Sequence, residues 1–103
     1  MKHILKIMHE DMELDKTIPE YAVFDKDKAH LLFECTEECK FLWIKLIDHH
    51  KKLYLTPNGS YVMERYYEGQ TPYYFVLSKA EAADFVREWD KEAYIRLFKP
   101  REL

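Results

Sequence analysis

The sequence is poor in glycine, in serine and in long apolar runs. Its 103 residues include two glycines, Gly59 and Gly69, so it has no glycine-rich loop of the kind that cradles a phosphate group. Its two serines, Ser60 and Ser78, fall in a predicted turn and at a predicted helix start, outside the pattern of a nucleophilic serine. No apolar stretch approaches the ~20 residues that a membrane helix requires. These absences argue against phosphate-loop, serine-hydrolase and membrane-spanning proteins.

Cysteine content and net charge narrow the classes of protein further. Cys35 and Cys39 are too few for the disulfide framework of a small secreted domain, and the N-terminus lacks the apolar core of a secretory signal. We therefore expect a cytoplasmic protein with reduced thiols and no membrane partner. The formal net charge is −3, from 16 basic and 19 acidic residues. This balance argues against nucleic acid as a partner, because such binding rests on clustered lysine and arginine.

Aromatic residues, in contrast, are abundant. The chain has eight Tyr, six Phe and two Trp, or 16% of its residues. Hydrophobic residues make up 48% and charged residues 34%, a balance typical of a folded globular protein. The length corresponds to a single α+β domain over residues 1–103.

Runs of β-forming residues predict most of the sheet. They cover residues 2–9, 21–25, 29–35, 52–57, 60–68 and 73–77. The charged sequence KDK between the second and third runs predicts a hairpin of 21–25 with 29–35. The Asn58-Gly59 pair predicts a second, tighter hairpin turn. The polar segment 10–20 is expected to be a long loop or a strand extension.

Two amphipathic helices are predicted from the spacing of apolar residues. The first covers residues 37–50, with Thr36 as its N-cap. Its stripe consists of Cys39, Leu42, Trp43, Leu46, Ile47 and His50. The second begins after Ser78, which forms a capping box with Glu81. Its stripe consists of Ala82, Phe85, Val86, Trp89 and Ala93.

Two segments have competing interpretations. The run 40–47 is rich in β-formers and also suits a strand. The cap, the acidic first turn and the basic last turn favour a helix there, because this charge order complements the helix dipole. Residues 93–99 can extend the second helix or form a last strand, and their alternation favours the strand.

The predicted fold is therefore α+β. It is an antiparallel sheet of about six to seven short strands with two amphipathic helices packed on one face. Residues 30–52 and 72–95 each contain a strand-like run, a capping residue and an amphipathic pattern. This similarity suggests an internal βββα duplication.

Candidate reactive residues have simpler structural explanations. A soft zinc set could be drawn from Cys35, Cys39, His49 and His50. The predicted helix, however, would hold Cys39 and His49 too far apart to share one ion. The glutamates around both cysteines would raise a thiol pKa and oppose a nucleophilic role. The acidic run 10–15 lacks the glycine and the distal glutamate of a calcium loop. We therefore expect no catalytic residue, no metal and no cofactor.

The aromatic residues suggest recognition of another protein. Tyrosine offers a large contact area at low entropic cost and is enriched at binding hot spots. The tyrosine-rich region 61–74 holds one basic residue, Arg65. The candidate partner-binding residues are Phe41, Ile44, Tyr61, Tyr66, Tyr67 and Tyr74. The leading hypothesis is a small non-catalytic interaction module, such as a regulator, an inhibitor or immunity-type partner, or an assembly subunit. A homodimer would be one form of it.

Two alternatives belong to other functional classes. A nucleic-acid-binding domain would use the open face of the sheet. A small-ligand-binding protein or an enzyme would use a pocket between the sheet and the helices. Retention on single-stranded nucleic acid would favour the first, and a ligand that raises the melting temperature would favour the second.

Overall fold

The computed structural model describes residues 2–11, 16–41 and 44–103. Its strands are β1 (Lys2–Asp11), β2 (Lys16–Asp25), β3 (His30–Phe41), β4 (Ile44–Leu55), β5 (Tyr61–Tyr67) and β6 (Tyr73–Leu77). Its helices are α1 (Lys79–Trp89), α2 (Lys91–Phe98) and a short 3-10 turn, η1 (Lys26–Lys28), between β2 and β3. The described strands form two antiparallel sheets, the hairpin β1-β2 and the four-stranded sheet β3-β4-β5-β6. The α+β class is confirmed, with six strands in two sheets.

The β4–β5 hairpin forms as the Asn-Gly pair predicts. Gly59 has a φ of +84°, a conformation that glycine adopts without steric cost. Its N–H donates to the Thr56 carbonyl at 2.9 Å, and the Thr56 N–H donates to the Ser60 carbonyl at 2.9 Å. This turn fixes the register in which Leu55 lies opposite Tyr61, and it thereby determines which β4 and β5 side chains share a face.

The helix predicted for residues 37–50 is wrong: the described residues 37–41 belong to β3 and 44–50 to β4. Glu37 pairs with His49 in the antiparallel ladder, and the Lys51 ammonium lies 3.2 Å from the Glu37 carboxylate. Thr36, the expected N-cap, instead contacts His50 across the strands, with 3.1 Å between Oγ1 and Nδ1. The β-forming residue types of this segment therefore agree with its structure. Its apolar residues have helical spacing, but strand pairing makes its backbone hydrogen bonds. Leu42 and Trp43 of the predicted stripe lie outside the described residues.

Two further predictions from the sequence do not hold in the structure. The βββα duplication is not confirmed, because its first copy contains no helix where one was predicted. The hairpin of 21–25 with 29–35 is also wrong, because β2 pairs with β1 over its whole length. The polar segment that was expected as a loop or a strand extension supplies residues 16–20 of β2, so the strand extension is the form observed there.

Both helices come from the C-terminal part of the chain. The capping box at Ser78 and Glu81 is confirmed, and the Ser78 hydroxyl accepts the Glu81 N–H at 3.1 Å. Residues 91–98 form α2 and not the favoured strand, because Asp90 caps a new helix by accepting the Ala93 N–H at 3.1 Å. The helix ends at Lys99, which is left-handed with a φ of +47° and precedes Pro100.

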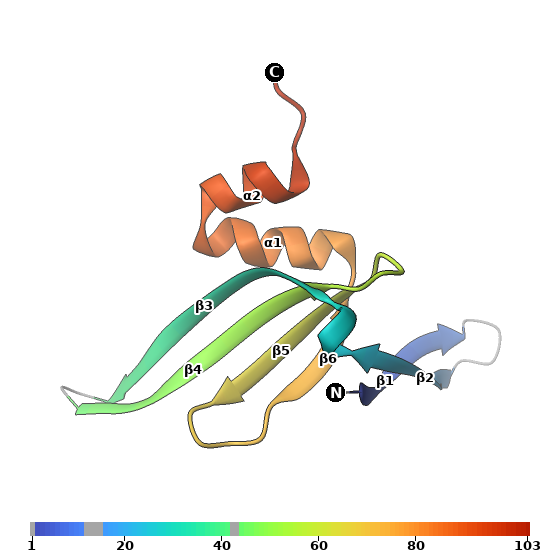
Figure 1. Cartoon of the computed structure of the whole chain (residues 1–103), viewed down its shortest axis with the longest axis horizontal. Helices are drawn as coiled ribbons and strands as arrows, with labels where there is room; N and C mark the ends of the chain where they lie inside the picture. Colours follow the sequence, from blue (N-terminus) through green and yellow to red (C-terminus); the bar gives the residue numbers. More distant parts are fainter. Residues whose placement is uncertain (1, 12–15, 42–43) are drawn as a thin grey trace.

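The four-stranded sheet has a different cover on each face (Figure 1). On the helix-side face, sheet residues pack with both helices in a cluster of Leu53, Met63, Ala82, Val86 and Ala93. On the hairpin-side face, sheet residues pack with the β1-β2 hairpin in a cluster of Leu5, Phe24, Tyr54 and Val62. Neither helix in the described part of the chain is long and apolar enough to cross a membrane.

Candidate binding surface

The β3-β4 pair extends beyond the rest of the sheet. The β4-β5 register ends where His49 lies opposite Tyr67, whereas the β3-β4 register continues to Phe41 opposite Ile44. Figure 1 shows this pair projecting past β5, far from the N-terminal hairpin. We call residues 38–41 and 44–48 the distal arm. Both faces of the sheet next to the distal arm carry polar and aromatic side chains instead of core residues.

On the helix-side face, exposed aromatic residues surround two basic side chains. Tyr67 is 38% exposed, Tyr73 is 55% exposed and Trp89 is 40% exposed. Arg65 lies opposite both Lys51 and Tyr73 in the sheet. The Lys51 ammonium is 5.3 Å from the centre of the Trp89 ring, which joins the sheet to the end of α1. We call the set His49, Lys51, Arg65, Tyr67, Tyr73 and Trp89 the aromatic surface.

The aromatic surface contains polar atoms without partners. His49 is 9% exposed and stacks on Tyr67, with ring centres 4.3 Å apart. Its Nε2 and the Nε of Arg65 are buried and have no hydrogen-bond partner within the described part of the chain. Burial, together with the charges of Lys51 and Arg65, lowers the pKa of His49. The imidazole is therefore neutral at pH 7, and its buried nitrogen carries the cost of an unmade hydrogen bond.

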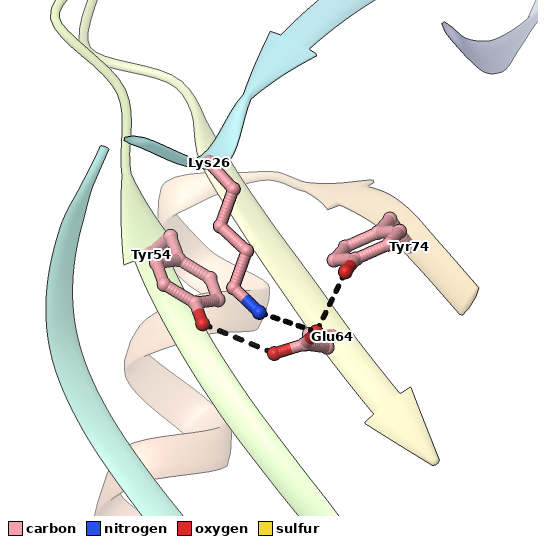
Figure 2. Close-up of polar contacts among 4 residues, drawn as sticks. All are labelled: Lys26, Tyr54, Glu64 and Tyr74. Carbon is pink, nitrogen blue, oxygen red and sulfur yellow. Dashed lines mark hydrogen bonds and ion pairs between the residues drawn. The ribbon is translucent and has the colours of Figure 1, made fainter. Parts of the chain in front are cut away.

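On the hairpin-side face, a buried carboxylate has all its partners (Figure 2). Glu64 is 1% exposed. Its Oε1 accepts the Tyr54 hydroxyl at 3.0 Å, and its Oε2 accepts the Tyr74 hydroxyl at 2.7 Å. Lys26, from η1, donates its ammonium to Oε2 at 3.1 Å. These four residues, the Glu64 network, link β4, β5 and β6 to the segment that follows the N-terminal hairpin.

The hydrogen bonds of the Glu64 network favour the ionised form of the Glu64 carboxylate. Burial raises the pKa of Glu64, but hydrogen bonds from Tyr74, Lys26 and Tyr54 outweigh burial, and the pKa lies below its ordinary value. Burial and the bond to Glu64 raise the pKa of both tyrosines. A general base works best with a pKa near neutrality, so these shifts suit a structural tether and not proton transfer.

The predicted site residues lie in separate places. Phe41 and Ile44 face each other at the end of the distal arm. Ile44 is 62% exposed, and the side chain of Phe41 lies outside the described structure. Tyr61 packs against Phe98 of α2, with ring centres 5.8 Å apart, so it serves the helix-side core.

The remaining predicted tyrosines divide between the two faces. Tyr74 belongs to the Glu64 network, and Tyr66 stacks on His50 with ring centres 4.8 Å apart. Tyr67 belongs to the aromatic surface. The structure therefore does not gather the six candidates into one site, because residues 66 and 67 are neighbours on a strand and point to opposite faces.

Tyr67 is the one member of the aromatic surface among the predicted partner-binding residues, and sequence reasoning missed the other five, including the aromatic residues Tyr73 and Trp89. Trp89 was assigned to the core stripe of the second predicted helix, but α1 ends there and leaves it 40% exposed. Strand alternation could have found Tyr73, because it lies directly opposite Arg65 once the β5-β6 register is known. Sequence alone does not provide that register.

The zinc set considered from the sequence does not converge. His49 and His50 are adjacent in β4, so their side chains lie on opposite faces of the sheet and cannot share one ion. Burial raises the pKa of Cys35, which keeps this thiol protonated and opposes a nucleophilic role. A different group of ligand-type residues, Asp48, His50 and Glu68, does meet within the described structure.

Comparison with known proteins assigns no relative. The chain matches no protein-family model, no curated protein and no solved structure.

Proposed function

We propose that this chain is a protein-interaction module that binds another protein through the aromatic surface. The observation that supports it is the grouping of Tyr67, Tyr73 and Trp89, which are 38%, 55% and 40% exposed, around Arg65 and Lys51. Tryptophan, tyrosine and arginine are the residues most enriched at binding hot spots. The sequence suggested the same class of function, but it named a different set of binding residues.

The polar atoms of the surface favour a partner that covers it. The Nε of Arg65 and the Nε2 of His49 are buried without hydrogen bonds to any residue that the structure describes, and a buried polar atom without a partner costs about 1–3 kcal/mol. A protein that supplies a carboxylate or a carbonyl to Arg65 would recover this cost by displacing the side chains that cover the Nε atom. Stacking of the guanidinium on Phe75, with 5.2 Å between Cζ and the ring centre, already fixes its direction.

The surrounding charges favour a protein over a nucleic acid. Lys51 is already paired with Glu37 at 3.2 Å. Arg65 lines an open recess beside α1 together with Glu81, Asp84 and Glu88. These carboxylates would repel a phosphate backbone, whereas a protein surface can match mixed charges.

The test is affinity capture from the native cell with three forms of the chain. The wild type should retain a partner that the triple variant Tyr67→Ala, Tyr73→Ala, Trp89→Ala does not. The control carries Ile4→Ala and Val23→Ala, two side chains of the N-terminal hairpin that are 76% and 67% exposed. We expect the control to retain the same partner. Equal capture by all three forms, or retention on single-stranded RNA that disappears in the triple variant, would contradict the proposal.

A further inference from the structure

Three side chains of the metal-binding type meet on the hairpin-side face beside the distal arm. Asp48, His50 and Glu68 each offer one ligand atom, and these atoms all lie within 4.8 Å of one another. Two carboxylates and one imidazole form a mixed oxygen and nitrogen set, which suits Zn²⁺ and other first-row divalent ions.

The sheet itself brings the three residues together. Asp48 and His50 are two positions apart in β4, so they share a face. The Glu68 N–H donates to the Asp48 carbonyl at 3.0 Å, which holds Glu68 opposite Asp48 just beyond the end of β5. The cluster thus depends on backbone pairing and not on the conformation of a loop.

His50 is held in place from both neighbouring strands. Thr36 of β3 contacts its Nδ1 through Oγ1 at 3.1 Å, and Tyr66 of β5 stacks on the ring with centres 4.8 Å apart. When Nδ1 carries the ring proton and donates it to Thr36, Nε2 presents the lone pair that a metal needs. Such an outer hydrogen bond is typical of metal-binding histidines. This oriented imidazole distinguishes the cluster from a group of surface carboxylates.

We propose that Asp48, His50 and Glu68 bind a divalent transition-metal ion, with Zn²⁺ as the first candidate. Ligand atoms about 2.0–2.2 Å from a tetrahedral zinc lie roughly 3.3–3.6 Å apart, and the atoms here lie within 4.8 Å of one another, so their separations must close by up to about 1.5 Å. Glu68 is exposed and can supply that movement. Water would complete the coordination. The site lies on the face opposite the aromatic surface, so it goes beyond the proposed function.

The experiment is calorimetric titration of the folded chain with Zn²⁺ alone, repeated with Mn²⁺. We expect one ion per chain for Zn²⁺. His50→Ala and Glu68→Gln should each weaken binding by at least about 10-fold, and Thr36→Val should weaken it by about 10-fold through the outer hydrogen bond. The matched control is His49→Ala, because it removes an imidazole from the next position of the same strand on the other face. Its affinity should stay within about twofold of the wild type.

Cysteine is the main competing ligand for zinc, and Cys35→Ser tests it directly. The proposal requires unchanged binding in Cys35→Ser and in the double variant with Cys39→Ser. Circular dichroism of each variant shows whether it is folded, and NMR shifts of the His50 ring on adding Zn²⁺ identify the ligand independently of affinity. The proposal is overturned if folded His50→Ala binds zinc as the wild type does, if the cysteine variants lose the ion, or if no binding occurs up to 1 mM Zn²⁺.

Discussion

The two faces of β4 and β5 solve the burial of polar groups in opposite ways. On the hairpin-side face, Glu64 is 1% exposed and accepts hydrogen bonds from two tyrosines and a lysine. On the helix-side face, His49 and Arg65 each keep a buried nitrogen without a partner in the described structure. The same two strands therefore carry a fully hydrogen-bonded carboxylate on one face and two such nitrogens on the other.

We propose that this difference separates a structural role from a binding role. A buried charge that is fully hydrogen-bonded fixes the elements that supply its partners. Unpaired polar atoms beneath exposed aromatic rings instead leave free energy that a partner can recover. We therefore propose that the Glu64 network holds η1 and the hairpin on the sheet, and that the aromatic surface serves recognition.

The largest effect should come from breaking the Glu64 network. Glu64→Ala leaves the hydroxyls of Tyr54 and Tyr74 and the ammonium of Lys26 without their acceptor. We expect the free energy of unfolding to fall by about 3 kcal/mol, as for other broken buried pairs. Urea unfolding measures it. Glu68→Ala, an exposed glutamate just past the same strand, is the control, and an equal loss in both variants would contradict a structural role for the network.

Removing one donor at a time should have a smaller effect. Tyr74→Phe deletes the hydroxyl that lies 2.7 Å from Glu64 but keeps the ring. We expect a loss of about 1.5–3 kcal/mol, the range for hydrogen bonds to charged groups. Tyr73→Phe removes the hydroxyl from the neighbouring tyrosine of β6, which is 55% exposed, and should change stability very little. If both variants lose the same free energy of unfolding in this assay, the Tyr74 hydroxyl in the Glu64 network contributes no more than the exposed Tyr73 hydroxyl.

The pH dependence of stability should also depend on Glu64. Its pKa is lowered in the folded protein, so its ionised form contributes fully above the unfolded value of about 4.3. That contribution is lost as the pH falls through the folded pKa. Unfolding free energies of the wild type and Glu64→Gln, measured from pH 7 to pH 3, should differ by a constant amount above about pH 5 and converge below it. A constant difference down to pH 3 would contradict the lowered pKa.

The smallest change in stability is expected on the aromatic surface. Tyr73→Ala should alter the free energy of unfolding by about 0.5 kcal/mol or less, because exposed side chains away from special features contribute little. The same variant should weaken capture of the partner. A loss of several kcal/mol in thermal or urea unfolding would instead show that Tyr73 belongs to the core.

Local signals in the sequence predicted the C-terminal half of the fold up to α1, whereas α2 forms where a strand was favoured. The Asn58-Gly59 turn and the Ser78 capping box act within a few residues, and both appear as expected. In the first half, the strands predicted over 2–9, 21–25 and 29–35 form, but the helix prediction failed because residues 37–50 have both helical spacing and β-forming residue types. Pairing with β3 and β5 decided between them, and that choice depends on contacts distant in the sequence.

The candidate site was less predictable than the fold. Strand alternation puts Arg65 and Tyr67 on one face, but Trp89 joins them through Lys51 across the sheet-helix contact. The Glu64 network needs Lys26, 38 positions away in the chain, which reaches it only when the hairpin docks. Such groupings follow from tertiary packing, and no local pattern encodes them.

Site-specific photocrosslinking in the native cell tests the central claim most directly. A photoreactive phenylalanine analogue at Tyr73, on the aromatic surface, is compared with the same analogue at Tyr21 of the hairpin. The two positions are 55% and 65% exposed, so accessibility alone cannot separate them. We predict a discrete crosslinked protein from position 73 and none from position 21. A crosslink from position 21 with none from position 73 would contradict the assignment of recognition to the aromatic surface.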